Sequence, residues 1–276
     1  MIRDFVITGE YFTSPVDYKE IFFRVAENEG EKAIIVLHGA CEHSGRHMNL
    51  IKFLWERGYS VFAPDLRGHG RSEGKQVHIN DFSEYLLDLQ KMIEISMIEN
   101  HQIHLFGHSM GGLIATRYVQ EYQPNISSLI LSSPLFGWKD MPKIEILAAK
   151  VISKVWPTFY FWNTVDETAL SHDPEVAQKY HNDLLVCNGG TARLGAEIEK
   201  NFILLFEKAE LVKVPLLLLV GGADRITDPK SSIRFFEKAG SKNKDYYIFE
   251  GMFHEIFNEI EKEKPFQKLS EWLEKF

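Results

Sequence analysis

The sequence predicts an α/β fold in which helices flank a mostly parallel central sheet and a helical cap is inserted into the chain. Short runs rich in Val, Ile, Leu and Phe alternate with longer stretches of helical periodicity. Several of these runs are apolar at almost every position, which is typical of strands buried on both faces of a parallel sheet. The alternation stops once, for about 80 residues between Pro134 and Pro215, which indicates an insertion.

The individual elements follow from these patterns in chain order. The apolar runs predict strands at 21–25, 33–39, 60–65, 103–107, 127–134, 215–222 and 246–251. Helical periodicity predicts helices at 46–57, 80–98, 110–123, 229–239 and 262–275. From the second strand onward, each strand is followed by a helix or by the insertion, so that the strands can run parallel.

The insertion is assigned to residues 136–206, and the flanking residues 1–135 and 207–276 to one core domain. Apolar residues at spacings of three and four predict an amphipathic cap helix, with one face formed by Ile144, Leu147, Val151 and Val155. The aromatic stretch WPTFYFW follows at 156–162. We expect most of these aromatic side chains to pack the cap onto the core, while an apolar lid with basic flanks would also suit transient contact with a membrane surface.

The composition and charge of the chain exclude some classes of function. The chain has 276 residues, a formal net charge of −8, 45% hydrophobic and 25% charged residues. No nucleic-acid binding is expected, because that requires clustered Lys and Arg. Two cysteines, Cys41 and Cys187, are too few for a disulfide framework and indicate a reducing compartment. Without a signal-peptide pattern or an apolar run near the ~20 residues of a transmembrane helix, the expectation is a cytoplasmic protein, monomeric or weakly associated, that at most touches membranes peripherally.

The stretch IHLFGHSMGGLIAT at 103–116 places a serine between glycines at the junction of a strand and a helix. Gly-x-Ser-x-Gly in this position is the nucleophile-elbow pattern of α/β-hydrolases, in which a tight turn exposes the serine hydroxyl above the sheet. Gly107 and Gly111 meet the steric requirement around Ser109. The motif alone also fits a glycine-rich turn with an incidental serine, so the decision rests on the partner residues.

Two further residues complete a catalytic triad in the chain order of this architecture. Asp224 follows the apolar strand LLLLVGG, and His254 follows the strand YYIFEG. His254 would act as the general base that takes the proton of Ser109, and Asp224 would hold the imidazole in the correct tautomer and stabilise its cation. Either residue alone could be an ordinary loop residue; all three at strand ends in this order predict catalysis.

An oxyanion hole needs two backbone donors. We expect these to be the N–H groups of Met110, directly after the nucleophile, and Ala40, after the strand AIIVLHG. The same loop carries His38, His43 and His47, but their spacings lack the Cys or carboxylate support of a zinc site. Neither a metal nor an organic cofactor is expected.

Four segments together, HGACEHSGR, DLRGHGRSEG, GHSMGG and GGADRI, resemble the monoacylglycerol lipase and lysophospholipase branch of the α/β-hydrolases. The resemblance extends from about residue 15 to the C-terminus, and the cap segment YHNDLLVCNGG at 180–190 is similar to that of the lipases. It implies hydrolysis of a lipid-like ester, a monoacylglycerol, through an acyl-serine intermediate. It further implies a polar pocket for the glycerol end formed by Glu42, Arg46 and Tyr180. For Glu42 and Arg46, an ion pair that braces the oxyanion loop is the alternative.

Two positions depart from the lipase pattern. Cys41 stands where the motif carries Gly, and His47 replaces an aromatic Tyr. These changes concern the selectivity for the headgroup and leave the triad unchanged.

The sequence excludes some of the other functions known for this fold and leaves others open. Ser109 excludes dehalogenases and epoxide hydrolases, which need a carboxylate at the elbow. A lysophospholipase or a broad carboxylesterase differs only in the leaving group, and acyl transfer only in the acceptor, so these alternatives stay open. A non-catalytic ligand-binding protein commonly lacks a triad member, and none is missing here.

Overall fold

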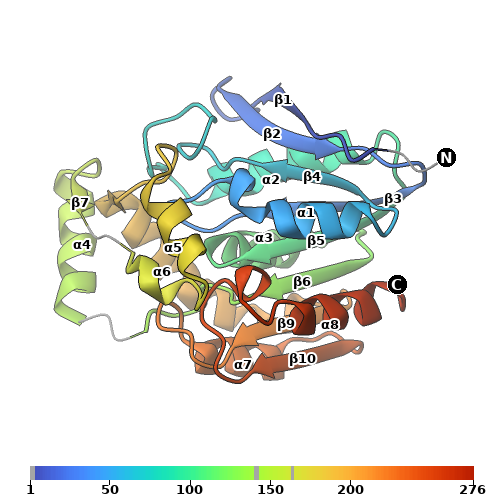
Figure 1. The fold of residues 1–276 in the computed structure, drawn as a ribbon. Coiled ribbons are helices and arrows are strands. Elements are labelled where there is room, and N and C mark those ends of the chain that lie inside the picture. Colours follow the sequence, from blue (N-terminus) through green and yellow to red (C-terminus); the bar gives the residue numbers. More distant parts are fainter. Residues whose placement is uncertain (1–3, 140–142, 163–164) are drawn as a thin grey trace.

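The computed structural model describes residues 4–139, 143–162 and 165–276 of the chain. Eight strands form one sheet in the order β1-β2-β4-β3-β5-β6-β9-β10 (Figure 1). Every neighbouring pair from β4 to β10 is parallel, whereas β1–β2 and β2–β4 are antiparallel. The predicted α/β fold with a mostly parallel sheet is therefore confirmed.

The sheet strands lie close to the predicted ranges. Their bounds are β1 Thr8–Thr13, β2 Glu20–Ala26, β3 Lys32–Leu37, β4 Ser60–Pro64, β5 Gln102–His108, β6 Ser128–Ser132, β9 Leu216–Gly221 and β10 Lys244–Phe249. The helices that flank the sheet are α1 Met48–Trp55, α2 Ser83–Ser96, α3 Met110–Tyr122, α7 Pro229–Lys238 and α8 Glu263–Leu273. A short 3-10 turn, η1 Ser44–His47, precedes α1, and another, η4 Ile256–Asn258, precedes α8.

Both faces of the central strands are buried, which explains their continuous apolar sequence. In β3, Ile35 and Leu37 contribute to the hydrophobic core under α2, α3 and α7, while Ile34 and Val36 contribute to the core under α1 and α8. Successive side chains of a strand point to opposite faces, so a strand covered on both sides must be apolar at every position. Leu216 to Leu219 of β9 are each fully buried, and such a leucine stabilises the fold by roughly 1.5–3 kcal/mol.

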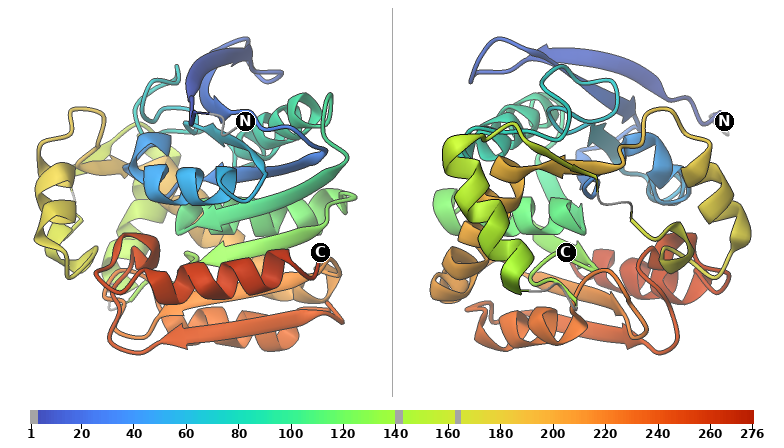
Figure 2. Two further views of the ribbon diagram at one scale, coloured as in Figure 1. Left: turned by 45° about the vertical axis from the view of Figure 1, so that its right-hand side comes forward. Right: turned by 90° about the vertical axis from the view of Figure 1, so that its left-hand side faces the viewer.

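The cap elements follow β6 and gather at one end of the sheet (Figure 2). Their bounds are α4 Lys143–Val155, β7 Tyr160–Trp162, η2 Glu167–Ala169, α5 Pro174–His181, β8 Gly189–Thr191 and α6 Ala192–Glu207. Helix α6 contacts α4 within the cap and α3 of the core, and its Ile198 and Leu205 join the main hydrophobic core. The division of the chain at residues 136 and 207 stays a prediction.

The amphipathic cap helix is present as α4, but its apolar face does not pack on the protein. Ile144, Leu147, Val151 and Val155 are 76%, 60%, 57% and 85% exposed. In the aromatic stretch, Phe159, Tyr160 and Phe161 are half-buried, whereas Trp156 and Trp162 are exposed. Packing therefore accounts for the middle of that stretch and not for its two tryptophans.

Three strands were not predicted. β1 is an edge strand with exposed side chains at five of its six positions, so it lacks the apolar pattern of the central strands. β7 and β8 pair only with each other and have three residues each, too few for periodicity to reveal. Strand β10 ends two residues earlier than expected, at Phe249 rather than Gly251, and it too is an edge strand.

No helix within the described residues combines the length and apolar character needed to cross a bilayer.

Candidate active site

Ser109 lies at the sharp junction between β5 and α3 and has a left-handed backbone, with φ of 51° and ψ of −120°. A non-glycine residue in this region is strained and persists only where its surroundings hold it. The holding contacts come from the neighbouring strand and the following loop. The Ser109 N–H donates to the carbonyl of Ser132 at 3.1 Å, and its own carbonyl accepts the N–H of Leu135 at 2.9 Å.

The glycines around Ser109 are required by close backbone contacts. A Cβ on Gly107 would lie 2.5 Å from the carbonyl oxygen of Gly111, and a Cβ on Gly111 would lie 2.5 Å from the carbonyl oxygens of Leu37 and His38. A Cβ on Gly39 would lie 2.9 Å from Cβ of Ser109. The start of α3 therefore packs directly against the ends of β3 and β5.

Asp224 and His254 form a buried hydrogen-bonded pair beyond the ends of β9 and β10. Asp224 Oδ2 accepts from His254 Nδ1 at 2.7 Å. The other carboxylate oxygen, Oδ1, accepts the N–H groups of Ile226 at 2.8 Å and Thr227 at 3.1 Å. Burial disfavours the charged form of both side chains, but the attraction and hydrogen bond between them outweigh the effect of burial. The pKa of Asp224 is therefore lowered and the pKa of His254 is raised.

The His254 ring lies beside the elbow, 4.6 Å from the ring of His108, the residue before Ser109. No hydrogen bond between Ser109 Oγ and His254 is present among the described residues. Such bonds are often long before substrate binds and shorten in the reacting complex. The structure thus gathers all three predicted triad residues at one end of the sheet, and their catalytic roles stay predictions.

The two predicted oxyanion donors lie on either side of Ser109, at the start of α3 and in the loop after β3. Across the described ranges, neither the N–H of Met110 nor that of Ala40 donates to a protein acceptor. The N–H of Gly39, next to Ala40, is instead occupied, because it donates to Glu42 Oε1 at 2.5 Å. Two free donors beside a strained serine fit an oxyanion hole.

Glu42, Arg46 and Tyr180 come together as the resemblance implied. Arg46 Nε lies 3.4 Å from Glu42 Oε2, and the Arg46 guanidinium carbon lies 4.7 Å from the centre of the Tyr180 ring. Glu42 Oε2, Arg46 Nε and the Tyr180 hydroxyl are buried with no hydrogen-bond partner in the described part of the chain. Glu42 and Arg46 thus form an ion pair, while the three atoms still lack a hydrogen bond that a ligand could supply, so both interpretations stay predictions.

Glu255 is a residue of this region that the sequence analysis missed. It is buried, follows His254 directly, and accepts Arg46 Nη2 at 2.7 Å through Oε1. Its Oε2 accepts from Asn258 Nδ2 at 2.8 Å. A carboxylate directly after the predicted base was the available signal.

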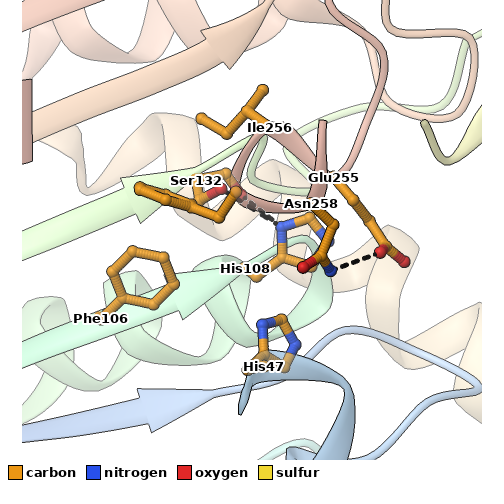
Figure 3. Close-up of a pocket in the computed structure, with 8 residues that line it drawn as sticks. His47, Phe106, His108, Ser132, Glu255, Ile256 and Asn258 are labelled. Carbon is orange, nitrogen blue, oxygen red and sulfur yellow. Dashed lines mark hydrogen bonds between the residues drawn. The ribbon is translucent and has the colours of Figure 1, made fainter. Parts of the chain in front are cut away.

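A small cavity lies between β5, β6 and residues 255–258 (Figure 3). Its polar lining is formed by His47, His108, Ser132, Glu255 and Asn258, and its apolar lining by Phe106, Ile256 and Phe257. His108 Nδ1 lies 3.2 Å from the carbonyl of Ser132, which fixes the ring beneath the elbow. Burial keeps the pKa of His108 well below its ordinary value, so this histidine is neutral.

The three histidines of the oxyanion loop have separate partners. His38 Nε2 accepts the N–H of Leu66 at 2.8 Å, His43 Nε2 lies 2.8 Å from Asp183 Oδ2, and His47 Nε2 lies 3.1 Å from Glu42 Oε1. No group of three or more His, Cys, Asp or Glu side chains suited to a metal occurs among the described residues.

Cys41 joins the oxyanion loop to the cap. It has a φ of 61°, the left-handed conformation that glycine adopts most easily, at the position where the lipase motif carries glycine. Its thiol donates to the carbonyl of Gly189 at 3.0 Å, and its carbonyl accepts the N–H of Cys187 at 3.1 Å. Burial raises the pKa of the Cys41 thiol to about 12, which keeps it neutral.

Comparison with known proteins agrees with this geometry. A family model described as serine aminopeptidase, S33, matches residues 28–261. The chain belongs to this family.

Proteins with related sequences include enzymes named for lipid substrates. Phospholipase YtpA of Bacillus subtilis is 33% identical over 237 residues, which cover 85% of this chain and 92% of the relative. A monoacylglycerol lipase of Mycolicibacterium smegmatis is 32% identical over 247 residues, 87% of each chain. The crystal structure of Paleococcus ferrophilus monoacylglycerol lipase superimposes with a TM-score of 0.86 at 34% identity, covering 92% of this chain and 98% of that one. The α/β-hydrolase fold predicted from the elbow and its partners is confirmed.

Proposed function

We propose that this chain is a serine hydrolase that cleaves the ester of monoacylglycerols to a fatty acid and glycerol. The observation that carries the proposal is the position of three buried polar atoms that lack a hydrogen bond in the described chain, in the loop and cap region next to the elbow of Ser109: the Tyr180 hydroxyl and the ion-paired Glu42 Oε2 and Arg46 Nε. The resemblance of the chain to monoacylglycerol lipases supports it.

In the proposed reaction, His254 takes the proton of Ser109 as Oγ attacks the ester carbonyl. The N–H groups of Met110 and Ala40 stabilise the oxyanion, and Asp224 stabilises the imidazolium. Collapse of the tetrahedral intermediate breaks the bond to the glycerol oxygen, which takes the proton from His254. Water, deprotonated by His254, then attacks the acyl-serine and releases the fatty acid and Ser109.

The charges of the alcohol pocket favour a neutral glycerol over a phosphorylated headgroup. Arg46 is held between the carboxylates of Glu42 and Glu255, so its positive charge is already balanced inside the protein. A phosphate would therefore find no unpaired positive charge on Arg46 and would lie beside two carboxylates, which disfavours it. Hydroxyl groups can both donate to Glu42 and accept from Arg46 or Tyr180.

The test is a comparison of kcat/KM for a monoacylglycerol, a lysophosphatidylcholine and a p-nitrophenyl ester with matched acyl chains. We expect the monoacylglycerol to be preferred. Preference for lysophosphatidylcholine would place the chain with phospholipases such as YtpA, and preference for the p-nitrophenyl ester with broad esterases.

Glu42→Gln is expected to weaken hydrolysis of glycerol esters selectively. The glutamine oxygen can still accept the N–H of Gly39, which holds the side chain in place, while the amide group that replaces Oε2 removes both an acceptor for substrate and the ion pair with Arg46. Loss of one charge-assisted hydrogen bond to substrate lowers kcat/KM for a monoacylglycerol roughly 10–100-fold. The p-nitrophenyl ester, which lacks the glycerol hydroxyls, serves as the internal control.

Tyr180→Phe is the matched variant in this experiment, because it removes a hydroxyl that has no hydrogen-bond partner within the described chain. It should show the same selectivity without loss of thermal stability. Equal losses on both ester types in both variants would assign these residues to bracing alone.

The exposed face of α4 supports a second part of the proposal, a transient contact of the cap with a lipid surface. Ile144, Leu147, Val151 and Val155 form one apolar stripe, and the exposed Trp156 continues it. Exposed apolar stripes with aromatic ends are typical of helices that lie at the membrane interface.

The double variant Leu147→Ser, Val151→Ser is expected to lose activity only on aggregated substrate. Removing two apolar side chains from a lipid contact should lower turnover of vesicle-borne monoacylglycerol about tenfold. Turnover of a water-soluble p-nitrophenyl acetate should not change. Ile98→Ser is the control, since this residue is also an exposed apolar side chain, at 76%, but lies outside the cap. An equal effect of the control variant would argue against the cap as the contact surface.

A further inference from the structure

The loop that carries His254 is anchored to the cap as well as to the sheet. The N–H of Glu255 donates to the carbonyl of Leu170 at 2.8 Å, and the N–H of His254 lies 3.4 Å from the carbonyl of Ala169. Both acceptors lie at the end of η2, in the cap. The backbone at the predicted base is therefore held by a cap segment that is distant from β10 in the sequence.

Glu259 is the side chain on which these two segments converge. Its Oε1 accepts the N–H of Phe253 at 2.8 Å and lies 2.9 Å from His172 Nδ1. Its Oε2 accepts the N–H of His172 at 3.1 Å and lies 3.3 Å from the hydroxyl of Ser171, which also lies 3.0 Å from the carbonyl of Asn258. The residue is 2% exposed. One buried carboxylate thus receives donors from the residue before His254 and from two consecutive cap residues.

The ionisation of Glu259 follows from these donors. Burial disfavours its charge, but the hydrogen bonds from Phe253 and His172 outweigh burial and hold the pKa of Glu259 below its ordinary value. A carboxylate that stays charged accepts all of these bonds at once, which a neutral amide could not do.

The same cap segment also reaches the loop of Asp224. The Phe253 ring stacks on the ring of His172, with centroids 3.7 Å apart, and the Arg225 guanidinium carbon lies 4.6 Å from the Phe253 ring centre. Arg225, which follows Asp224, donates through Nη2 to the carbonyl of Thr168 at 2.7 Å. Residues 168–172 of the cap therefore contact the neighbours of both Asp224 and His254.

We propose that Glu259 is a positioning residue for His254, which fixes the imidazole relative to Ser109 by tying the His254 loop to residues 168–172 of the cap. This inference rests on the proposed function only in that His254 is the general base. It makes the cap base a part of the catalytic framework, in addition to any role in covering substrate. A displacement of a base by about 1 Å can reduce turnover by as much as 100-fold, so such an anchor affects kcat directly.

The test compares Glu259→Gln with Glu261→Gln. In the first variant an amide N–H₂ group faces backbone and side-chain donors that need an acceptor. Glu261 is a matched control two residues away, with an exposed side chain paired to Lys264. Three measurements are made well below the unfolding temperature. The first gives kcat and KM for p-nitrophenyl butyrate, and the second gives the rate at which an alkyl fluorophosphonate modifies Ser109 with release of fluoride. The third follows the downfield proton resonance of the His254 Nδ1–H.

For Glu259→Gln we expect kcat to fall about tenfold with KM nearly unchanged. The phosphonate rate should fall in parallel, because it too needs His254 to accept the Ser109 proton, and the His254 resonance should shift or broaden. Glu261→Gln should match the wild type in all three. A Glu259→Gln variant with a lower Tm but unchanged kcat, phosphonate rate and resonance would overturn the proposal and leave Glu259 a purely structural residue.

His172→Phe covers the case in which Glu259→Gln does not fold. Phenylalanine keeps the stack on Phe253 and removes the bond from Nδ1 to Glu259, so a loss in kcat of about threefold is expected, and an unchanged kcat contradicts the proposal. Activity on p-nitrophenyl butyrate distinguishes a failure of the proposed substrate from a failure of the proposed role of Glu259. A wild-type chain active on p-nitrophenyl butyrate and inactive on monoacylglycerol would refute the substrate assignment alone, whereas one inert to both esters and to the phosphonate would refute both.

Discussion

Ser109→Ala is expected to abolish ester hydrolysis and to leave the fold intact. Removal of the nucleophile of a triad lowers kcat by roughly 10⁴–10⁶-fold, since the remaining groups cannot form the acyl intermediate. Within the described chain, Ser109 Oγ makes no hydrogen bond, so its removal breaks no internal contact. Turnover of p-nitrophenyl butyrate and thermal unfolding followed by circular dichroism measure the two effects, and Tm should change by no more than about 2 °C.

Ser133→Ala provides the control for this change. Ser133 also has a left-handed φ, of 40°, and its buried hydroxyl has no partner among the residues described. It lies after β6, beside the elbow strand, but is not assigned to the site. We expect it to retain turnover. If Ser109→Ala kept wild-type turnover, Ser109 would not be the nucleophile, whatever its geometry.

Asp224→Asn is expected to lower kcat/KM by about 10³–10⁴-fold with little change in structure. The asparagine oxygen can still accept the N–H groups of Ile226 and Thr227, which hold the side chain in place. Its amide group would face His254 Nδ1 and donate to it, so that the imidazole takes the wrong tautomer and cannot accept the Ser109 proton. Steady-state kinetics with the generic ester measure the loss. A variant with near wild-type kcat/KM would show that another carboxylate orients His254.

The pH dependence of kcat/KM provides a second measurement on the Asp224→Asn variant. In the wild type, Asp224 raises the pKa of His254, and general-base catalysis needs the neutral imidazole, so kcat/KM should fall as pH drops through that raised pKa. Without the carboxylate, the acid limb of the profile should move to lower pH. The lowered pKa of Asp224 also makes the stability of the fold depend on pH: its contribution is present above the unfolded pKa and is lost as pH falls through the folded one. Identical acid limbs in the two proteins would contradict the assignment of the pair.

The sequence anticipated the central sheet well because burial on both faces leaves a direct trace. Strands such as β9 must be apolar at every position, and their ends are marked by the glycines and acids that the turns require. The edge strand β1 left no such trace, since a strand exposed at most positions can carry almost any residue. The short strands β7 and β8 were missed for a related reason, because three residues are too few to show a period.

Residues at strand ends could be assigned from the sequence, whereas residues that act across the chain could not. Ser109, Asp224 and His254 each follow a recognisable strand, and parallel strands bring their carboxyl ends to one edge of the sheet. Tyr180 was placed near Arg46 only through the family resemblance. The sequence also did not predict that the apolar face of α4 points toward solvent. A hydrophobic period shows that one side of a helix is apolar, but it does not show what covers that side.

The sequence by itself determined the α/β fold and predicted the cap insertion and the elbow with its two partners, because each of these depends on local spacing and on which strands are buried. Only the tertiary structure decided that Glu255 pairs with Arg46 and that Glu259 ties the His254 loop to the cap. A buried carboxylate is defined by the donors that surround it, and here those donors come from segments that meet only when the chain has folded.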